Sequence, residues 1–111
     1  STALFYAKRN NPEVANMLRT AVEFVRAARD GDLDVVQAGI DAGLNLNMRY
    51  VSMTALMWAA ARGHLAVVRA LLDHGANVNL EDNFGRTALA IASAEGHDDI
   101  ATMLREAGAV E

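Results

Sequence analysis

Cysteine is absent from the 111-residue chain, proline occurs once, and aromatic residues make up only 5% of the sequence. Without cysteine the chain can form no disulfide and no thiolate-based metal or catalytic site. With so few large rings, the core must be closed mainly by alanine and other small residues, which favours closely packed helices over a β-sandwich. The β-branched runs are short and leave little material for a sheet. These absences predict an all-α fold.

Positive charge is also scarce. Ten basic and 14 acidic residues give a net charge of −4, and they are spread along the whole chain. The basic footprint that nucleic-acid binding requires is therefore missing. The longest strongly apolar stretch, residues 54–61, is far shorter than the roughly 20 residues of a membrane span. We expect a single domain that binds neither nucleic acid nor a membrane.

An internal repeat of 33 residues is the strongest positive signal in the sequence. The segment TALMWAAARGH at 54–64 returns as TALAIASAEGH at 87–97. An upstream copy matches the middle copy at an offset of 32, so that three copies cover residues 22–109. Each copy indicates two short helices with a glycine between them. Because neither helix is long enough to be stable alone in water, the copies must stack on one another.

This pattern resembles the ankyrin repeat, whose motif D-x-x-G-x-T-P-L-H-x-A is followed by a second helix and by G-A-x-x-N. The family positions matched in the last copy are Asp82, Gly85, Thr87, Leu89, Ala92, Gly96, His97 and Gly108. Ala88 and Ala90 replace the proline and histidine of the motif in this copy, and Ala55 and Met57 replace them in the middle copy. The resemblance implies an all-α solenoid of stacked antiparallel helix pairs joined by β-hairpin-like loops.

The copies divide the single domain into four segments. These are a degenerate helical half-repeat at 1–21, a capping-like repeat at 22–47, an internal repeat at 48–80 and a C-terminal repeat at 81–111. TALFYA at 2–7 echoes the start of a first helix. We expect a helix to begin at Pro12, with Asn11 as its cap, and to continue without interruption into the next repeat. It should cover the N-terminal end of the stack.

Most polar residues at repeat positions have a structural interpretation. The glycines at 63, 75, 96 and 108 should end helices in the left-handed conformation. The asparagine pairs at 45/47 and 77/79 should stabilise tight turns. His64 and His97 resemble the structural hydrogen-bonding histidine of the family. The first hairpin lacks the usual aspartate and glycine between residues 48 and 53 and is one residue shorter than the second, so we expect its tip to have an unusual shape.

No group of residues supports catalysis. His74 lies near a helix end, where an imidazolium interacts well with the helix dipole, and no second ligand stands beside it at metal spacing. Ser52 and Ser93 have no histidine and carboxylate arranged around them, and the chain has no glycine-rich phosphate loop. We expect no metal, no cofactor and no enzymatic activity.

Ankyrin repeats bind proteins through the tips of their hairpins and the exposed side of their first helices, and the resemblance implies the same role for the matching positions here. These positions are Arg49, Tyr50, Val51 and Met53 on the first hairpin, Asn83, Phe84 and Arg86 on the second, and Met57, Trp58, Arg62 and Glu95 on the helices. The residue types are those enriched at interface cores. Alternatively, Trp58 fills a gap between helices and Phe84 packs under its own hairpin.

Arg49, Arg62 and Arg86 would make this face basic, so we expect a partner protein with an acidic loop or patch. The leading hypothesis is a monomeric interaction module, of an inhibitor or immunity type, that sequesters one target. The alternative is a scaffold segment of a longer array. Because the chain begins at Ser1, we expect a processed or trimmed piece. The cytosol is the usual compartment of the family, and a bacterial periplasm is the alternative if a signal peptide has been removed.

Overall fold

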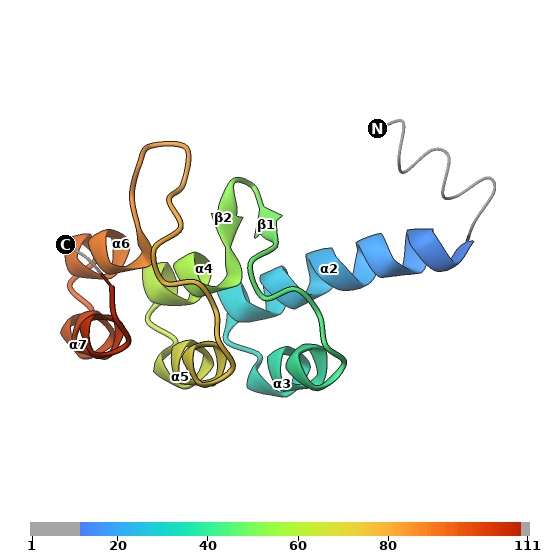
Figure 1. Cartoon of the computed structure of the whole chain (residues 1–111), viewed down its shortest axis with the longest axis horizontal. Helices are drawn as coiled ribbons and strands as arrows, with labels where there is room; N and C mark the ends of the chain where they lie inside the picture. Colours follow the sequence, from blue (N-terminus) through green and yellow to red (C-terminus); the bar gives the residue numbers. More distant parts are fainter. Residues whose placement is uncertain (1–11, 110–111) are drawn as a thin grey trace.

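The computed structural model describes residues 12–109, with side chains from residue 21 onward. The echo at 2–7 and the expected cap at Asn11 lie outside the described residues. The elements are α2 (Pro12–Asp30), α3 (Leu33–Asp41), β1 (Arg49–Tyr50), β2 (Met53–Thr54), α4 (Ala55–Arg62), α5 (Leu65–Asp73), α6 (Ala88–Ala94) and α7 (Asp98–Glu106). Their order is that of three helix pairs, with a short hairpin between the first and second (Figure 1).

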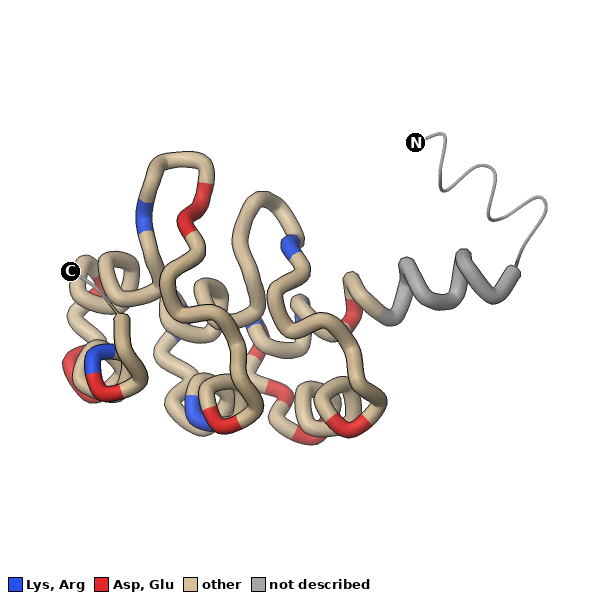
Figure 2. The backbone as a smooth tube through the Cα atoms, in the orientation of Figure 1, with Lys and Arg blue, Asp and Glu red and all other residues tan. Residues whose placement is uncertain are grey.

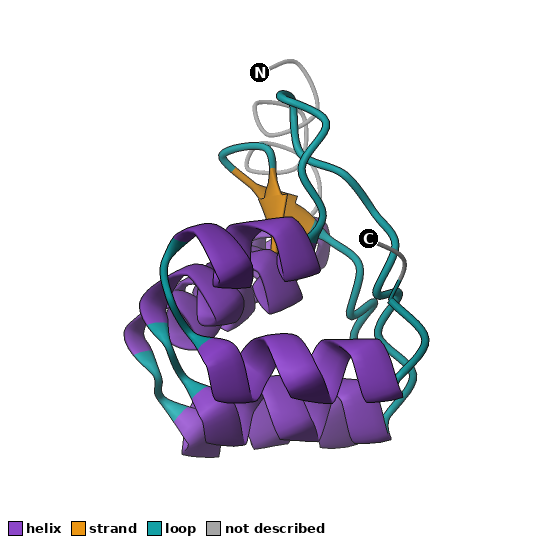
Figure 3. Ribbon diagram, turned by 90° about the vertical axis from the view of Figure 1, so that its left-hand side faces the viewer, coloured by secondary structure: helices purple, strands orange, loops and turns teal. Residues whose placement is uncertain are grey.

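The helices form two layers. In the first layer α4 packs between α2 and α6, and in the second layer α5 packs between α3 and α7. The loops at 48–54 and 80–87 project from the same side of the stack (Figure 1, Figure 2). Viewed along the stack, the two layers lie one above the other (Figure 3). The all-α repeat solenoid predicted from the sequence is confirmed.

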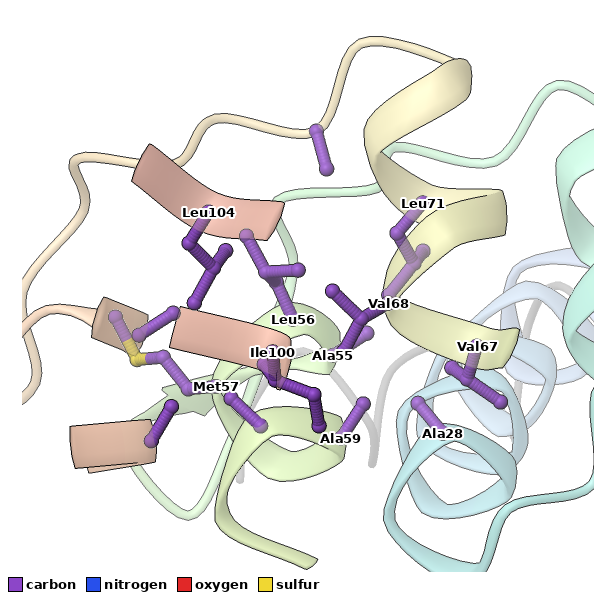
Figure 4. Packing of buried hydrophobic residues seen from close by; sticks show 14 of the residues in the cluster. Ala28, Ala55, Leu56, Met57, Ala59, Val67, Val68, Leu71, Ile100 and Leu104 are labelled. Atoms are coloured by element: carbon purple, nitrogen blue, oxygen red, sulfur yellow. The ribbon is translucent and has the colours of Figure 1, made fainter. Parts of the chain in front are cut away.

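The core runs along the stack between the two layers, and small residues close it as predicted. Ala27, Ala59 and Ala92 occupy the same position in the three repeats, and all three are buried. Larger side chains from α5 and α7 fill the space between them, among them Leu71 and Leu104 (Figure 4). Alanine on one helix leaves room for a larger apolar side chain on the next, which gives dense packing without aromatic rings.

The helix boundaries follow from local chemistry. Although the proline of the family motif is missing, the hydroxyl of Thr54 accepts a hydrogen bond from the amide of Met57 at 3.3 Å. The hydroxyl of Thr87 caps α6 in the same way. Gly63 ends α4 in the left-handed conformation, with φ of 78°, as the sequence predicted. α4 and α6 therefore each have a side-chain cap that replaces the rigid proline start.

Asparagine side chains stabilise the turns that follow the second helices, as expected. The side-chain oxygen of Asn45 accepts from the amide of Asn47, and that of Asn77 accepts from the amide of Asn79. The side chain of Asn47 also accepts from the amide of Asn77, 30 residues away, at 2.9 Å. This last bond links one repeat to the next, so the asparagines contribute to stacking as well as to the turns.

Two histidines also connect successive repeats. Nε2 of His64 donates to the carbonyl of Arg29 at 2.9 Å, and Nε2 of His97 donates to the carbonyl of Ala61 at 3.3 Å. The ring of His64 lies so close to Gly31 that a Cβ there would come within 2.7 Å of it. The structural role predicted for these residues is confirmed, and each histidine bonds the end of the preceding first-layer helix.

We expect His64→Ala to lower the free energy of unfolding by about 1–2 kcal/mol, because the carbonyl of Arg29 loses its partner and the contact with Gly31 is lost. His74→Ala is the matched control, since the exposed ring of His74 bonds only the carbonyl of Ala70 in its own helix. The control should change stability by about 0.5 kcal/mol or less. Urea denaturation followed by circular dichroism measures both, and equal effects would contradict a role in joining repeats.

The first helix of the described chain is continuous. α2 runs without a break for 19 residues, as the sequence predicted, and its C-terminal half packs against both α3 and α4. In Figure 1 the N-terminal half of α2 extends beyond α3, past the N-terminal end of the stack. No helix in the described part of the chain combines the length and apolar character needed to cross a bilayer.

Candidate protein-binding surface

The two projecting loops and the adjoining ends of the first-layer helices make up one side of the molecule, which we call the loop edge. It comprises the first hairpin at 48–54, the second loop at 80–87, and the exposed side chains of α2 and α4 beside them. β1 contacts α2, and β2 contacts α4. The hairpin is thus seated on the first layer rather than standing free.

The first hairpin turns tightly through two residues. Its strands are antiparallel, with Arg49 opposite Thr54 and Tyr50 opposite Met53. The two turn residues, Val51 and Ser52, both have positive φ angles, of 52° and 65°. Such a turn is normally made by Asn-Gly, and the left-handed conformation is a genuine outlier for a β-branched residue. The turn therefore stores about 1–3 kcal/mol of backbone strain. The unusual tip predicted from the sequence takes this form.

Two side chains hold the strained turn in place. Nη1 of Arg49 donates to the carbonyl of Ser52 and to the carbonyl of Glu81, each at 2.8 Å. Nε1 of Trp58 donates to the carbonyl of Tyr50 at 2.9 Å. Arg49 therefore links the first hairpin to the second loop, and Trp58 links it to α4. Both residues position the tip, in addition to any contact they make with a partner.

Val51→Asn should stabilise the chain by about 1 kcal/mol, because asparagine adopts the left-handed conformation with less strain than valine. Val51→Thr is the control, since threonine keeps the β-branch and should give no gain. Differential scanning calorimetry would show a higher melting temperature for the asparagine variant alone. An equal melting temperature for all three proteins would mean that the turn is not strained.

The second loop is built around a buried carboxylate. Oδ1 of Asp82 accepts hydrogen bonds from the amides of Phe84 and Arg86, both at 2.9 Å. Oδ2 accepts from Nε of Arg86 at 3.0 Å and pairs with its Nη2 at 2.9 Å. Burial would raise the pKa of Asp82, but the hydrogen bonds from these two amides and from the guanidinium outweigh it, and the pKa lies below its usual value.

This network places Phe84 at the tip of the second loop. Its side chain is 83% exposed, and the guanidinium carbon of Arg86 lies 5.6 Å from the ring centroid. That distance is within the range of a cation–π contact. The alternative in which Phe84 packs under its own hairpin is therefore wrong, because Asp82 fills the inside of the loop and turns the ring outward.

Trp58 lies at the junction of α2, α4 and the first hairpin. It is half-buried against the core, and the guanidinium carbon of Arg29 lies 5.9 Å from its ring centroid. The ring thus fills a gap between helices, as one of the two alternatives proposed, and still shows part of its surface on the loop edge. Arg29 also bonds Asp30 through Nε at 3.0 Å.

Three arginines gather around Asp30. The hydrogen bond from Arg29 and the charges of Arg29, Arg26 and Arg62 lower the pKa of Asp30, although its partial burial acts in the opposite direction. The same ion pair raises the pKa of Arg29. One carboxylate therefore stands among three guanidinium groups, which leaves the junction between α2 and α4 positively charged.

Charge is distributed unevenly between this junction and the second layer. Exposed acidic residues gather along α3, α5 and α7 and the turns before them (Figure 2), namely Asp32, Asp34, Asp41, Asp73, Asp98, Asp99 and Glu106. Against them stand Arg69 and Arg105. The second layer is therefore acidic. On the first layer and the loops the arginines at 26, 29, 49, 62 and 86 are balanced by Glu23, Asp30, Glu81, Asp82 and Glu95, so the excess of positive charge there is local to the junction around Asp30.

The structure separates the predicted binding residues by exposure. Most of them are open to solvent, namely Arg49, Val51, Arg62, Asn83, Phe84, Arg86 and Glu95, while Tyr50, Met53 and Trp58 are half-buried. The prediction is wrong for Met57, which is only 1% exposed. It lies on the side of α4 that faces α6, and the equivalent Ala90 is exposed because no described helix pair follows α6. Met57 belongs to the core and not to the surface.

Arg26 and Arg29 were not predicted, although both belong to the positively charged junction. Asp30 is the repeat equivalent of Arg62, at the offset of 32, and Arg26 and Arg29 lie within about one helical turn of Asp30. Carrying the repeat numbering back into the first copy would have located this region.

Comparison with known proteins agrees with the repeat architecture. A family model for ankyrin repeats, with three copies, matches residues 24–110. A search of curated proteins finds no match. Among the residues that the structure describes, no three histidine, aspartate or glutamate side chains lie close enough together to hold a metal ion.

Proposed function

Because the chain belongs to the ankyrin-repeat family, we propose that it binds a partner protein through the loop edge. Ankyrin repeats are generally protein–protein interaction modules, and they are typically non-enzymatic. The observation that carries the proposal is the exposure of two apolar side chains at the loop tips. Val51 is 68% exposed and Phe84 is 83% exposed, far more than any other large apolar side chain that the structure describes.

The setting of these tips supports recognition. Val51 sits on a strained turn that Arg49 and Trp58 hold in place, and Phe84 sits on a loop fixed by Asp82. A rigid loop loses little conformational entropy when it binds. Strain that persists at an exposed position, where a better turn residue would fit, is consistent with selection for binding.

The charge around the tips favours a partner that presents an acidic loop or patch. Arg86 pairs with Asp82 and contributes little net charge, but Arg26 and Arg62 share the single carboxylate of Asp30 with Arg29. A partner carboxylate near this junction would meet an excess of guanidinium groups. A protruding tip beside a charged junction fits an inhibitor or immunity-type protein that inserts into a cleft of one target.

A scaffold segment of a longer array is less well supported. The exposed residues of α7 are largely polar, namely Asp98, Asp99, Thr102, Arg105 and Glu106. The equivalent positions of α5, which stacks against a following helix pair, are Leu65, Ala66, Arg69, Leu72 and Asp73. α7 is thus the more polar of the two helices, as is typical of a terminal repeat of a solenoid.

The proposal is tested by capture from an extract of the native cells, with the immobilised chain as bait and mass spectrometry of the retained proteins. A triple variant, Val51→Asp, Phe84→Asp and Arg62→Glu, should lose the retained partner and keep the circular dichroism spectrum of the folded chain, since all three side chains are exposed. The control variant, Leu33→Asp with Leu65→Asp, changes two exposed residues of the second layer and should retain the partner. Loss in the control alone would refute the loop edge as the binding surface.

A further inference from the structure

The junction between α2 and α4 is formed by side chains that meet across the two helices. On α2, Arg29 and Asp30 follow Arg26 by three and four residues, so the three lie on one side of the helix. On α4, Arg62 follows Trp58 by four residues. α2 packs directly against α4, and the guanidinium carbon of Arg29 lies 5.9 Å from the ring centroid of Trp58. Guanidinium groups and one aromatic face therefore share this surface.

The carboxylate inside the junction is held loosely. Nε of Arg29 donates to Oδ1 of Asp30 at 3.0 Å, and no other hydrogen bond reaches this carboxylate from the described part of the chain. The side chain of Asp30 is 57% exposed. An exposed ion pair between neighbouring residues contributes little to stability. A second carboxylate can therefore compete with Asp30 for the guanidinium of Arg29.

Arg62 supplies an unpaired guanidinium beside this carboxylate. Its side chain is exposed and forms no hydrogen bond or ion pair with any residue that the structure describes. The hydrogen bond from Arg29 and the charges of Arg26 and Arg62 together lower the pKa of Asp30, so all three guanidinium groups act on it. Arg26 differs from Arg62, because it lines a pocket together with two further carboxylates, those of Glu23 and Asp32. Arg62 is thus the guanidinium most available to a partner.

The repeat positions show why Asp30 is the carboxylate that competes. Asp30, Arg62 and Glu95 are equivalent positions in the three copies, and α4 packs between α2 and α6. Arg62 therefore lies between the two acidic positions. Asp30 is bonded to Arg29 beside the ring of Trp58, whereas the side chain of Glu95 forms no hydrogen bond or ion pair within the described residues.

Given the proposed function, on which this inference rests, we propose that Arg29 and Arg62 bind a carboxylate of the partner beside the ring of Trp58, and that Asp30 competes with it. Guanidinium groups bind carboxylates through charge-assisted hydrogen bonds that are stronger than neutral ones. In the free chain Asp30 takes this place on Arg29. Asp30 is therefore a specificity-determining residue, because it disfavours every partner whose carboxylate binds the two arginines too weakly to displace it.

Trp58 is the single tryptophan of the chain, so its fluorescence reports on the junction. Titration of the full chain with a capped hexaglutamate peptide should change this fluorescence, and a hexaglutamine peptide should not. Arg62→Gln should abolish the change. Arg69→Gln, which removes the same charge from α5 in the second layer, should leave it intact. No response to hexaglutamate, or a response that survives Arg62→Gln, would overturn the proposal.

Asp30→Asn tests the competition itself. Removal of the competing carboxylate should raise the affinity for hexaglutamate about three- to ten-fold, as expected for one charge at close range in an exposed site. The control is Asp73→Asn, which removes the same charge from an exposed residue at the end of α5 away from Arg62. In about 0.1 M salt, where distant charges are screened, the control should change the affinity less than about two-fold.

Two results of this comparison would overturn the competition. A lower affinity of Asp30→Asn would mean that Asp30 orients Arg29 for binding instead of competing with the partner. Equal effects of Asp30→Asn and Asp73→Asn would mean that only the net charge of the chain matters. Neither result depends on the loop tips. If capture of the native partner still required Val51 and Phe84 in that case, the proposed function would stand and only the role of the junction would be wrong.

Discussion

Met57→Ala is expected to lower the free energy of unfolding by about 2–5 kcal/mol, because it removes a buried side chain and leaves a cavity between α4 and α6. The family resemblance placed Met57 on the binding surface, where truncation would hardly affect stability. The structure places it in the core at 1% exposure. Urea denaturation followed by circular dichroism distinguishes the two positions directly.

The control for this experiment is Arg62→Ala, at an exposed position on the same helix. It should change the free energy of unfolding by about 0.5 kcal/mol or less. If Met57→Ala had an effect as small as the control, Met57 would lie on the surface. The register of α4 between α2 and α6 would then have to be revised.

The second large effect is expected for Asp82→Ala, which should cost about 2–4 kcal/mol of unfolding free energy. The variant leaves the amides of Phe84 and Arg86 without their acceptor and removes the ion pair with the guanidinium. Glu81→Ala is the control, because Glu81 is exposed and takes part in the loop through its main-chain carbonyl. Equal melting temperatures for the two variants would contradict a structural role for the Asp82 carboxylate.

The contribution of Asp82 should also depend on pH. Its pKa in the folded chain lies below the usual value, so the folded state favours the ionised carboxylate. The resulting stability is fully present above the unfolded pKa of about 4 and is lost as the pH falls through the folded pKa. The difference in melting temperature between the natural chain and Asp82→Ala should therefore shrink only below about pH 4. Shrinkage that begins near neutral pH would mean that burial dominates and the pKa is raised.

Features set by local chemistry could be predicted from the sequence. Gly63 ends its helix in the left-handed conformation, and Asn77 bonds the amide of Asn79 two residues on. Both depend on a few neighbouring residues, and both recur at the repeat spacing. The fold followed because short helices with alanine-lined faces are stable only when they stack.

Features that join one repeat to the next could not be predicted in the same way. Arg49 donates to the carbonyl of Glu81, 32 residues away, and Met57 is buried only because α6 packs against its side of α4. A motif fixes which positions correspond, but it does not say which side of a helix meets its neighbour. The residues of the loop edge could be located from the resemblance, whereas their division between structural and exposed roles required the coordinates.

The central claim is that the loop edge contacts the partner. Hydrogen exchange of the chain, measured alone and with its captured partner, tests this most directly. We predict slower amide exchange at 48–54 and 80–87 in the complex, and unchanged exchange in α3, α5 and α7. Slower exchange confined to the second layer, with both loops unaffected, would contradict the claim.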